Sequence, residues 1–285
     1  MSSGASSDEI PVRDDVTSPV HRALAILELL GSDEVNGSLG VVEIARRLGR
    51  DKSQVSRALR MLADIGFVDR EPRTLRYRIG TRLFAVAAKA VDRRLREESE
   101  QVTARLAALL GERVEVLVRC GAEAVTISSS APGQMLLAVG WVGRTQPLAS
   151  TAAGRCLLFD SEDEEIARLL AVVGIEGSGP QVPRSLDEVV QRVRADSARG
   201  FSICVQESDR EFLAVGVPVR DVHARTVAGL QVCGPQRRME EAMDETIRQS
   251  IAAAQVISAA LGGADGRPPT LPSEGRRVGT GKAGA

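Results

Sequence analysis

The sequence contains few aromatic side chains, few histidines and few cysteines. Phe, Trp and Tyr make up only 2% of the 285 residues, which argues against the stacked aromatic platform that RNA and single-strand binding proteins use. The four cysteines and two histidines show no metal-ligand spacing. We therefore expect no metal site, no disulfide framework and no cofactor.

Long apolar runs are also absent. No stretch approaches the roughly 20 apolar residues that cross a bilayer, and the N-terminal segment MSSGASSDEIPVRDD lacks the basic start and apolar middle of a secretory signal. We expect a cytoplasmic protein without membrane contact. Its 43% hydrophobic and 26% charged residues are typical of a globular chain, and its length allows one large or two ordinary domains.

Catalytic signatures are missing as well. The sequence contains no GxSxG, HExxH or GxxxxGK[ST] pattern, and no histidine is placed to serve a nucleophile. Glu112, Glu207 and Asp221 are the only acidic residues that loosely resemble a catalytic group. We therefore expect that the protein is not an enzyme.

The sequence does contain a strongly basic segment within a nearly neutral chain. The formal net charge of the whole chain is −1, whereas residues 41–82 hold eleven Lys and Arg against five Asp and Glu, a local net charge of +6. Such a segment is typical of a nucleic-acid-binding module inside an ordinary soluble protein. An arginine-rich solvated surface is the alternative, and composition alone does not separate the two.

Three helices are predicted in and before this segment. Ser18 can cap the first helix, which ends at Gly31. Apolar residues at helical spacing predict a short second helix over 41–48, and a third helix from Asp51, which can cap it, to Ile65. Because only a short turn separates the second and third helices, we predict a helix-turn-helix.

The third helix has two different sides. Its apolar side suits a protein core, and its start and opposite side carry Ser, Gln, Lys and Arg, the side chains that contact base edges and phosphates in the major groove. The apolar side consists of Val55, Ala58, Leu59 and Leu62. The predicted DNA contacts are Lys52, Ser53, Gln54, Ser56, Arg57 and Arg60.

A hairpin is predicted directly behind this helix. Residues 66–70 and 75–79 have strand character, and EPRT between them forms the turn. Strand alternation places Leu75, Tyr77 and Ile79 inward and the intervening arginines outward. A basic hairpin beside a recognition helix is a wing that contacts phosphates or a minor groove. The predicted wing contacts are Arg73, Arg76 and Arg78.

The remainder of the chain predicts an α+β fold. Several β-rich runs follow one another directly, which favours a largely antiparallel sheet flanked by helices. We expect strands at 114–120, 124–129, 201–206, 212–220 and 226–233. We expect helices at 81–96, 99–110, 151–159, 162–173, 185–199 and 237–262.

One helix start in this region invites two interpretations. In the stretch STAAG, at 150–154, a capping hydroxyl precedes small residues. Such a helix start can leave N–H groups accessible to a carboxylate or another polar ligand group. The same small residues also suit close packing of the helix, and the sequence alone favours neither interpretation.

Several motifs in order resemble the IclR family of transcriptional regulators. They are SPVHRALAILELL, VVEIARRLGRDKSQVSRALRMLADIGFVDREPRTLRYRIGTRL, GERVEVLVRCGAEAVTI, PLASTAAGRCLLF, ARGFSICVQES and VGVPVRD…VAGLQVCGP, over roughly residues 18–260. The resemblance implies an N-terminal winged helix-turn-helix domain and a C-terminal effector domain with a sheet of the GAF or profilin type. It implies a sequence-specific repressor or activator that senses a metabolite and binds double-stranded DNA.

The resulting domain prediction has five parts. They are a disordered arm at 1–17, a winged helix-turn-helix at 18–80, a linker and dimerisation helix at 81–96, an effector domain at 97–263 and a disordered tail at 264–285. One winged module makes a small DNA interface, so we expect a homodimer on a palindromic operator. The resemblance implies a homotetramer as the alternative assembly.

The resemblance also places an effector site in the second half, for a small molecule such as a carboxylate. Its lining falls on Met135, Leu136, Ala152, Ala153, Gly154, Cys204, Ala214, Gln231 and Cys233. Several positions depart from the family pattern, among them Arg155 in place of a lysine, and Gln231 and Cys233 in place of serines. The alternative is therefore a DNA-binding regulator whose degenerate effector domain acts through protein contacts.

Overall fold

The computed structural model describes residues 18–32, 35, 37–87, 91–132 and 141–263. The predicted arm at 1–17 and tail at 264–285 lie outside the described residues. The chain divides into two compact units, Met1–Val91 and Asp92–Ala285, and each unit is described by itself.

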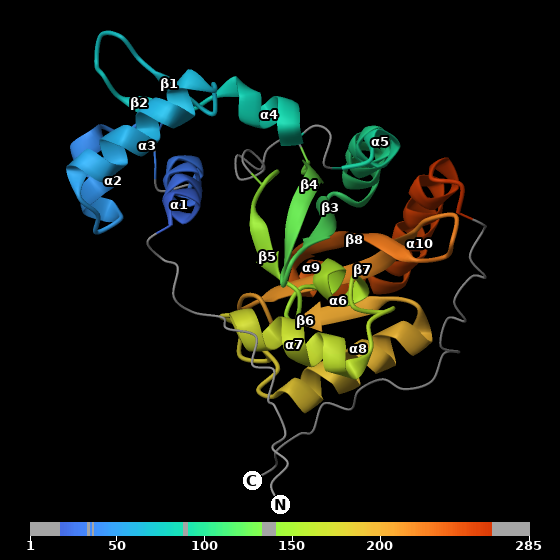
Figure 1. The fold of residues 1–285 in the computed structure, drawn as a ribbon. Coiled ribbons are helices and arrows are strands. Elements are labelled where there is room, and N and C mark those ends of the chain that lie inside the picture. Colours follow the sequence, from blue (N-terminus) through green and yellow to red (C-terminus); the bar gives the residue numbers. More distant parts are fainter. Residues whose placement is uncertain (1–17, 33–34, 36, 88–90, 133–140, 264–285) are drawn as a thin grey trace, which may run out of the picture. The chain divides into compact units, whose positions relative to one another are not determined.

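The first unit is a helical core with a hairpin (Figure 1). Its elements are α1 (Pro19–Gly31), α2 (Val41–Arg47), α3 (Lys52–Asp64), β1 (Val68–Arg70), β2 (Tyr77–Ile79) and α4 (Thr81–Ala87). The helix-turn-helix and the wing are both confirmed. The apolar side of α3 is buried as predicted, in one cluster with Ile26 and Leu30 of α1 and Ile44 of α2.

Side-chain caps fix where two of these helices begin. The Ser18 hydroxyl accepts a hydrogen bond from the backbone N–H of His21 at 3.1 Å. Asp51 Oδ1 accepts from the backbone N–H groups of Ser53 at 2.8 Å and Gln54 at 3.2 Å. Both predicted caps are therefore confirmed, and each satisfies N–H groups that a helix start leaves without a partner.

The wing is joined to the segment before α2. Leu39 and Tyr77 exchange two backbone hydrogen bonds of 2.9 and 2.8 Å, so Leu39 continues the small β1–β2 sheet. Leu75 differs from its predicted inward orientation: it is 53% exposed. Its φ of 58° lies in the left-handed region, which breaks the strand alternation at the end of the turn.

The second unit is built on one six-stranded antiparallel sheet. The strands are β3 (Arg113–Cys120), β4 (Glu123–Ser130), β5 (Thr145–Pro147), β6 (Ser202–Val205), β7 (Phe212–Arg220) and β8 (Thr226–Pro235). Their order across the sheet is β5-β4-β3-β8-β7-β6. The predicted α+β class is therefore confirmed.

Helices cover both faces of this sheet (Figure 1). They are α5 (Arg93–Leu110), α6 (Ala152–Cys156), α7 (Asp163–Val173), α8 (Leu186–Arg199), α9 (Gln236–Glu241) and α10 (Met243–Ala260). Helices α5 and α10 pack on one face, and the short α6 lies on the other, with α8 packed against α6 and α7 against α8. No helix in the described part of the chain is long and apolar enough to span a membrane.

Several elements differ from the predictions: for example, α5 begins at Arg93 and not at 99, and α6 ends at Cys156 and not at 159. The predicted helix at 81–96 is not one continuous helix, because α4 ends at Ala87 and α5 begins after Asp92. Asp92 caps α5 by accepting hydrogen bonds from the N–H groups of Arg94 and Leu95. The predicted helix at 237–262 is divided at Ala242 into α9 and α10. The three-residue strand β5 was not predicted.

Candidate functional site

The solvent side of α3 carries the predicted recognition residues. Lys52, Ser53, Arg57 and Arg60 are exposed, and Gln54 and Ser56 are half-buried. The Ser53 hydroxyl also donates to Asp51 Oδ1, so part of its hydrogen-bonding capacity is used in the cap. This bond and the N–H donors of the cap hold the pKa of Asp51 below its ordinary value. The surface therefore presents arginine, lysine and amide groups from a helix whose start is fixed.

The three predicted wing arginines have different surroundings. Arg73 is exposed in the turn, and Arg78 is 67% exposed with its Nε 3.6 Å from Asp69 Oδ2. Arg76 departs from the predicted outward orientation, because its Nε donates to the carbonyl oxygen of Ser38 at 3.1 Å and its Nη2 lies 3.4 Å from Glu43 Oε2. Arg76 therefore ties the wing to the residues before and within α2.

A second candidate site is a cavity of about 360 Å³ in the second unit, within the range of small-molecule sites. It opens over the face of the sheet that carries α6. It is lined by Arg113, Trp141, Gln146, Pro147, Thr151, Ser208, Asp209, Phe212, Ala214, Gln231 and Cys233.

The strand register explains why these residues meet. Arg113 pairs with Cys233 and Cys233 with Ala214, so the three form one row across β3, β8 and β7. Two residues along β3, Glu115 pairs with Gln231 and belongs to the same face. Residues far apart in sequence therefore point into one cavity because antiparallel pairing aligns them.

The predicted effector residues are only partly brought to this cavity. Ala214, Gln231 and Cys233 line it. Ala152 and Cys204 lie in an adjoining buried cluster with Ala214 and Cys233. Met135 and Leu136 lie outside the described residues.

The start of α6 is packed rather than open. The N–H of Ala153 donates to Gln231 Oε1 at 3.0 Å, and the N–H of Gly154 donates to Thr151 Oγ1 at 3.2 Å. A Cβ on Gly216 of β7 would come within 2.4 Å of the Ala152 backbone, so α6 lies directly on the sheet. Of the two interpretations of this stretch, the structure supports close packing. The Ala153 and Gly154 N–H groups are already used within the protein.

A buried polar network forms one wall of the cavity. Gln231 Nε2 donates to Glu115 Oε2 at 2.8 Å and lies 3.3 Å from Gln146 Oε1. Gln146 Nε2 in turn donates to Thr126 Oγ1 at 2.9 Å and to Glu115 at 3.3 Å. Since these amides bond to one another and to Oε2 of the fully buried Glu115, they have little capacity left for a ligand, whereas Glu115 Oε1 has no hydrogen-bond partner among the described residues.

Arg113 is the cationic group of the cavity. Its guanidinium stacks on Trp141 at 3.9 Å from the ring centroid and lies 5.6 Å from the centroid of Phe212. Its Nε donates to Cys233 Sγ at 3.3 Å and lies 3.6 Å from Glu115 Oε1. Sequence reasoning missed Arg113 and Trp141.

The cavity offers no reactive thiol. Burial raises the pKa of the Cys233 thiol to about 12, and burial raises the pKa of Cys204 as well. Both thiols therefore stay protonated at neutral pH and pack as small apolar groups. Within the described residues no cluster of three or more His, Cys, Asp or Glu side chains could hold a metal ion.

The three acidic residues considered as catalytic candidates are each held in ion pairs. Glu112 accepts from Arg238 Nε at 2.7 Å and Nη2 at 2.9 Å. Asp221 accepts from Arg225, and Glu207 accepts from Arg155 and Arg192. Their partners give each carboxylate a structural role.

Comparison with known proteins covers both units. The family model described as IclR helix-turn-helix domain matches residues 19–72, and the one described as Bacterial transcriptional regulator IclR C-terminal matches residues 87–259. The chain is 26% identical to the transcriptional regulator KdgR of Escherichia coli, over 89% of this chain and 96% of that protein. It is also 26% identical to the repressor AllR of Escherichia coli, over 88% and 93%.

Solved structures show the same fold. An IclR transcriptional regulator from Alicyclobacillus acidocaldarius has a TM-score of 0.73 at 24% identity and covers 86% of this chain and 98% of its own. An IclR homolog from Microbacterium hydrocarbonoxydans, solved in complex with 4-hydroxybenzoate, has a TM-score of 0.74 at 18% identity, over 86% and 99% of the two chains.

Proposed function

Because the chain belongs to the IclR family of transcriptional regulators, we propose that α3 and the wing bind operator DNA and that the cavity beside α6 binds a small acid. The chain is a DNA-binding transcriptional regulator with a C-terminal effector-binding domain, and it is not an enzyme. The residues of each site, the class of effector and the assembly are the parts proposed here.

In the DNA site, α3 occupies the major groove and the wing follows the backbone. Arg57 and Arg60 are exposed on α3 and can fork onto guanine, and half-buried Gln54 can pair with adenine. Arg73 and Arg78 contact phosphates, since both guanidinium groups are exposed. Lys52, Ser53 and Ser56 contribute from the start and side of the helix.

Arg113 carries the proposal for the effector. Gln146, Gln231 and Thr151 already bond within the protein, whereas among the described residues the Nη atoms of Arg113 have no hydrogen-bond acceptor. Two parallel N–H groups suit a carboxylate, and Trp141 and Phe212 provide apolar surface for the rest of a small molecule. The relative solved with 4-hydroxybenzoate holds an aromatic acid, which fits this chemistry.

Assembly follows from the small size of one DNA module. Helix α4 has no buried residue, and Phe84 is 72% exposed. We place a dimer contact within 81–96, so that two copies engage a palindromic operator in the cytoplasm, as a dimer or as a tetramer of such dimers.

A two-part experiment on the full chain tests this function. Selection from random duplexes should enrich one palindromic sequence, and the enriched DNA then serves in anisotropy titrations. Trp141 is the only tryptophan, so its fluorescence should respond to an acid from a panel that includes benzoate, 4-hydroxybenzoate and pyruvate. Arg113→Met should abolish the response, whereas Arg105→Met, on exposed α5 surface, should keep it.

The two parts fail separately. If DNA is selected but no acid changes either fluorescence or DNA affinity, the effector proposal is wrong and the regulator acts through protein contacts. If no duplex is enriched at low salt, the assignment of α3 and the wing to DNA is wrong.

A further inference from the structure

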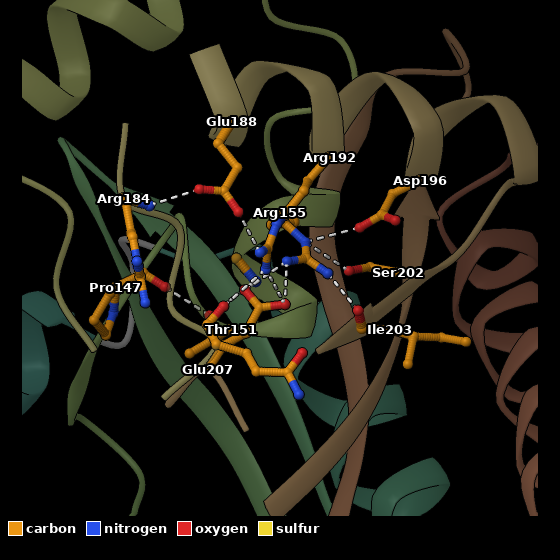
Figure 2. Close-up of polar contacts among 12 residues, drawn as sticks. Pro147, Thr151, Arg155, Arg184, Glu188, Arg192, Asp196, Ser202, Ile203 and Glu207 are labelled. Atoms are coloured by element: carbon orange, nitrogen blue, oxygen red, sulfur yellow. Dashed lines mark hydrogen bonds and ion pairs between the residues drawn. The ribbon is translucent and has the colours of Figure 1, made fainter. Parts of the chain in front are cut away.

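Arg155 on α6 is one of the most deeply buried charged residues of the second unit, with 1% of its surface exposed. All three guanidinium nitrogens have acceptors. Nε donates to Asp196 Oδ2 at 2.8 Å and to Ser202 Oγ at 3.1 Å. Nη1 donates to both oxygens of Glu207 at 2.7 Å, and Nη2 donates to the carbonyl oxygen of Ile203. Figure 2 shows these groups converging on Arg155 from different segments.

This single side chain therefore joins α6 to α8, to β6 and to the loop between β6 and β7. Arg192 of α8 lies 2.9 Å from Glu207 Oε1, and Arg199 also pairs with Asp196. The two buried carboxylates are thus matched by arginines, which a buried ion network requires to be stable.

Glu207 is directly followed by two residues that line the cavity, Ser208 and Asp209. The backbone beside it is held from the other side as well. The N–H of Gly179 donates to the carbonyl oxygen of Glu207 at 3.1 Å, and the Ser178 hydroxyl donates to that of Ser208 at 2.7 Å. The segment 206–209, which contributes Ser208 and Asp209 to the cavity wall, is therefore fixed between the Arg155 network and the segment 178–181. We call it the 206–209 wall.

The α6 end of the Arg155 network also reaches the cavity. The N–H of Arg155 donates to the carbonyl oxygen of Thr151, which lines the cavity one helical turn earlier. In the same turn of α6, the N–H of Ala153 donates to the side chain of Gln231, another lining residue, and this bond fixes the position of the turn.

We infer that Arg155 is a positioning residue that sets the separation between the α6 side of the effector cavity and its 206–209 wall. This inference rests on the proposed function of the cavity. Arginine suits the role because its planar fork binds Glu207 with one nitrogen and Asp196 and Ile203 with the others. A lysine, the residue that the family pattern has here, offers one ammonium and cannot occupy all of these directions.

Hydrogen exchange and fluorescence quenching test the inference without a known effector. In Arg155→Lys, the amides of Ser178, Gly179, Gln181 and Gln206, which hydrogen-bond to or within the wall, should exchange about tenfold faster. Acrylamide should quench Trp141 more strongly, because the cavity that it lines opens. Exchange in the central strand β3 should stay unchanged.

Two further variants complete the test. Arg194→Lys is the matched control: this arginine of α8 bonds to Asp163 and to the Ser161 carbonyl oxygen, away from the wall, and its replacement should leave both readouts unchanged. Glu207→Gln keeps the side-chain size but removes the charge, and it should change both readouts in the direction of Arg155→Lys. Glu207→Gln alone decides the question if Arg155→Lys does not fold.

A lower melting temperature with unchanged exchange at these amides and unchanged quenching would show that the network only stabilises the unit, and would overturn the inference. Because neither readout needs an effector, this result is distinct from failure of the acid-binding proposal.

Discussion

Arg76 Nε lies 3.1 Å from the carbonyl oxygen of Ser38 and 3.2 Å from its hydroxyl oxygen. Together with the two backbone hydrogen bonds between Leu39 and Tyr77, this contact attaches the wing to the segment before α2. An arginine that its strand position assigned to phosphate contact is therefore used within the protein.

Replacing Arg76 should thus affect the stability of the protein more than its electrostatic attraction to DNA. We expect Arg76→Ala to reduce the free energy of unfolding by about 1 kcal/mol, since a partly exposed charged donor leaves the Ser38 carbonyl. Arg73→Ala should leave stability unchanged but lower the slope of log affinity against log salt by about 1. Denaturant unfolding measures the free energy of unfolding, and anisotropy titrations over a salt series measure the salt slope. A shallower salt slope for Arg76→Ala at unchanged stability would contradict this assignment.

Arg57 should carry sequence discrimination. If it forks onto a guanine, Arg57→Ala should narrow the gap between operator and random DNA by about 1–3 kcal/mol. Competition anisotropy with the selected operator and a scrambled duplex gives this gap. Arg105→Ala, which makes the same charge change on exposed α5 surface, is the control. Equal losses on both duplexes would show that Arg57 contacts only the backbone.

Because α6 packs directly on the sheet, adding one methyl group at Gly216 should have a large effect on stability. A Cβ at Gly216 would meet Ala152 backbone and side-chain atoms at 2.4 to 2.9 Å. We expect Gly216→Ala to cost about 1–3 kcal/mol of unfolding free energy. Gly31→Ala, where a Cβ has no neighbour within 4 Å, should cost far less. A stability of Gly216→Ala equal to that of the unaltered chain would mean that α6 does not hold this position.

The cap of α3 makes a prediction about pH. Hydrogen bonds from the Ser53 hydroxyl and the Gln54 N–H lower the pKa of Asp51 from its ordinary value of 3.8. The folded form thus holds this proton less tightly than the unfolded form, so the stabilisation is present above pH 3.8 and is lost as the pH falls through the lower folded pKa. The amide NMR shifts of Ser53 and Gln54 should titrate below 3.8, and Asp51→Asn should remove the transition. A midpoint at or above 3.8 would show that the cap does not lower the pKa of Asp51.

The sequence predicted features that depend on neighbouring residues. Ser18 and Asp51 are recognisable as caps because a cap acts over the next three positions. The buried side of α3 and the positions of the longer strands along the chain follow from the period of apolar residues in the same way. The helix-turn-helix, the wing and the α+β class were therefore accessible from the sequence.

The sequence did not predict features that depend on distant partners. Nothing near Arg76 indicates that Ser38 accepts its hydrogen bonds, and nothing near Ala153 indicates that Gln231 takes its N–H. Arg113 became a site residue only when the β3–β8 register placed it beside Cys233. Three of the predicted effector residues, Ala214, Gln231 and Cys233, line the cavity, whereas its polar groups were not predicted, and their role in binding an effector stays a prediction.

The attachment of the wing limits how this protein can acquire a new operator. Since Leu39 and Tyr77 pair through their backbones, the hairpin is held to the segment that leads into α2. A shift of the wing along the duplex would require that pairing to break. If α3 and the wing bind DNA as proposed, a new sequence preference would therefore arise more readily by exchanging their exposed side chains than by moving the wing.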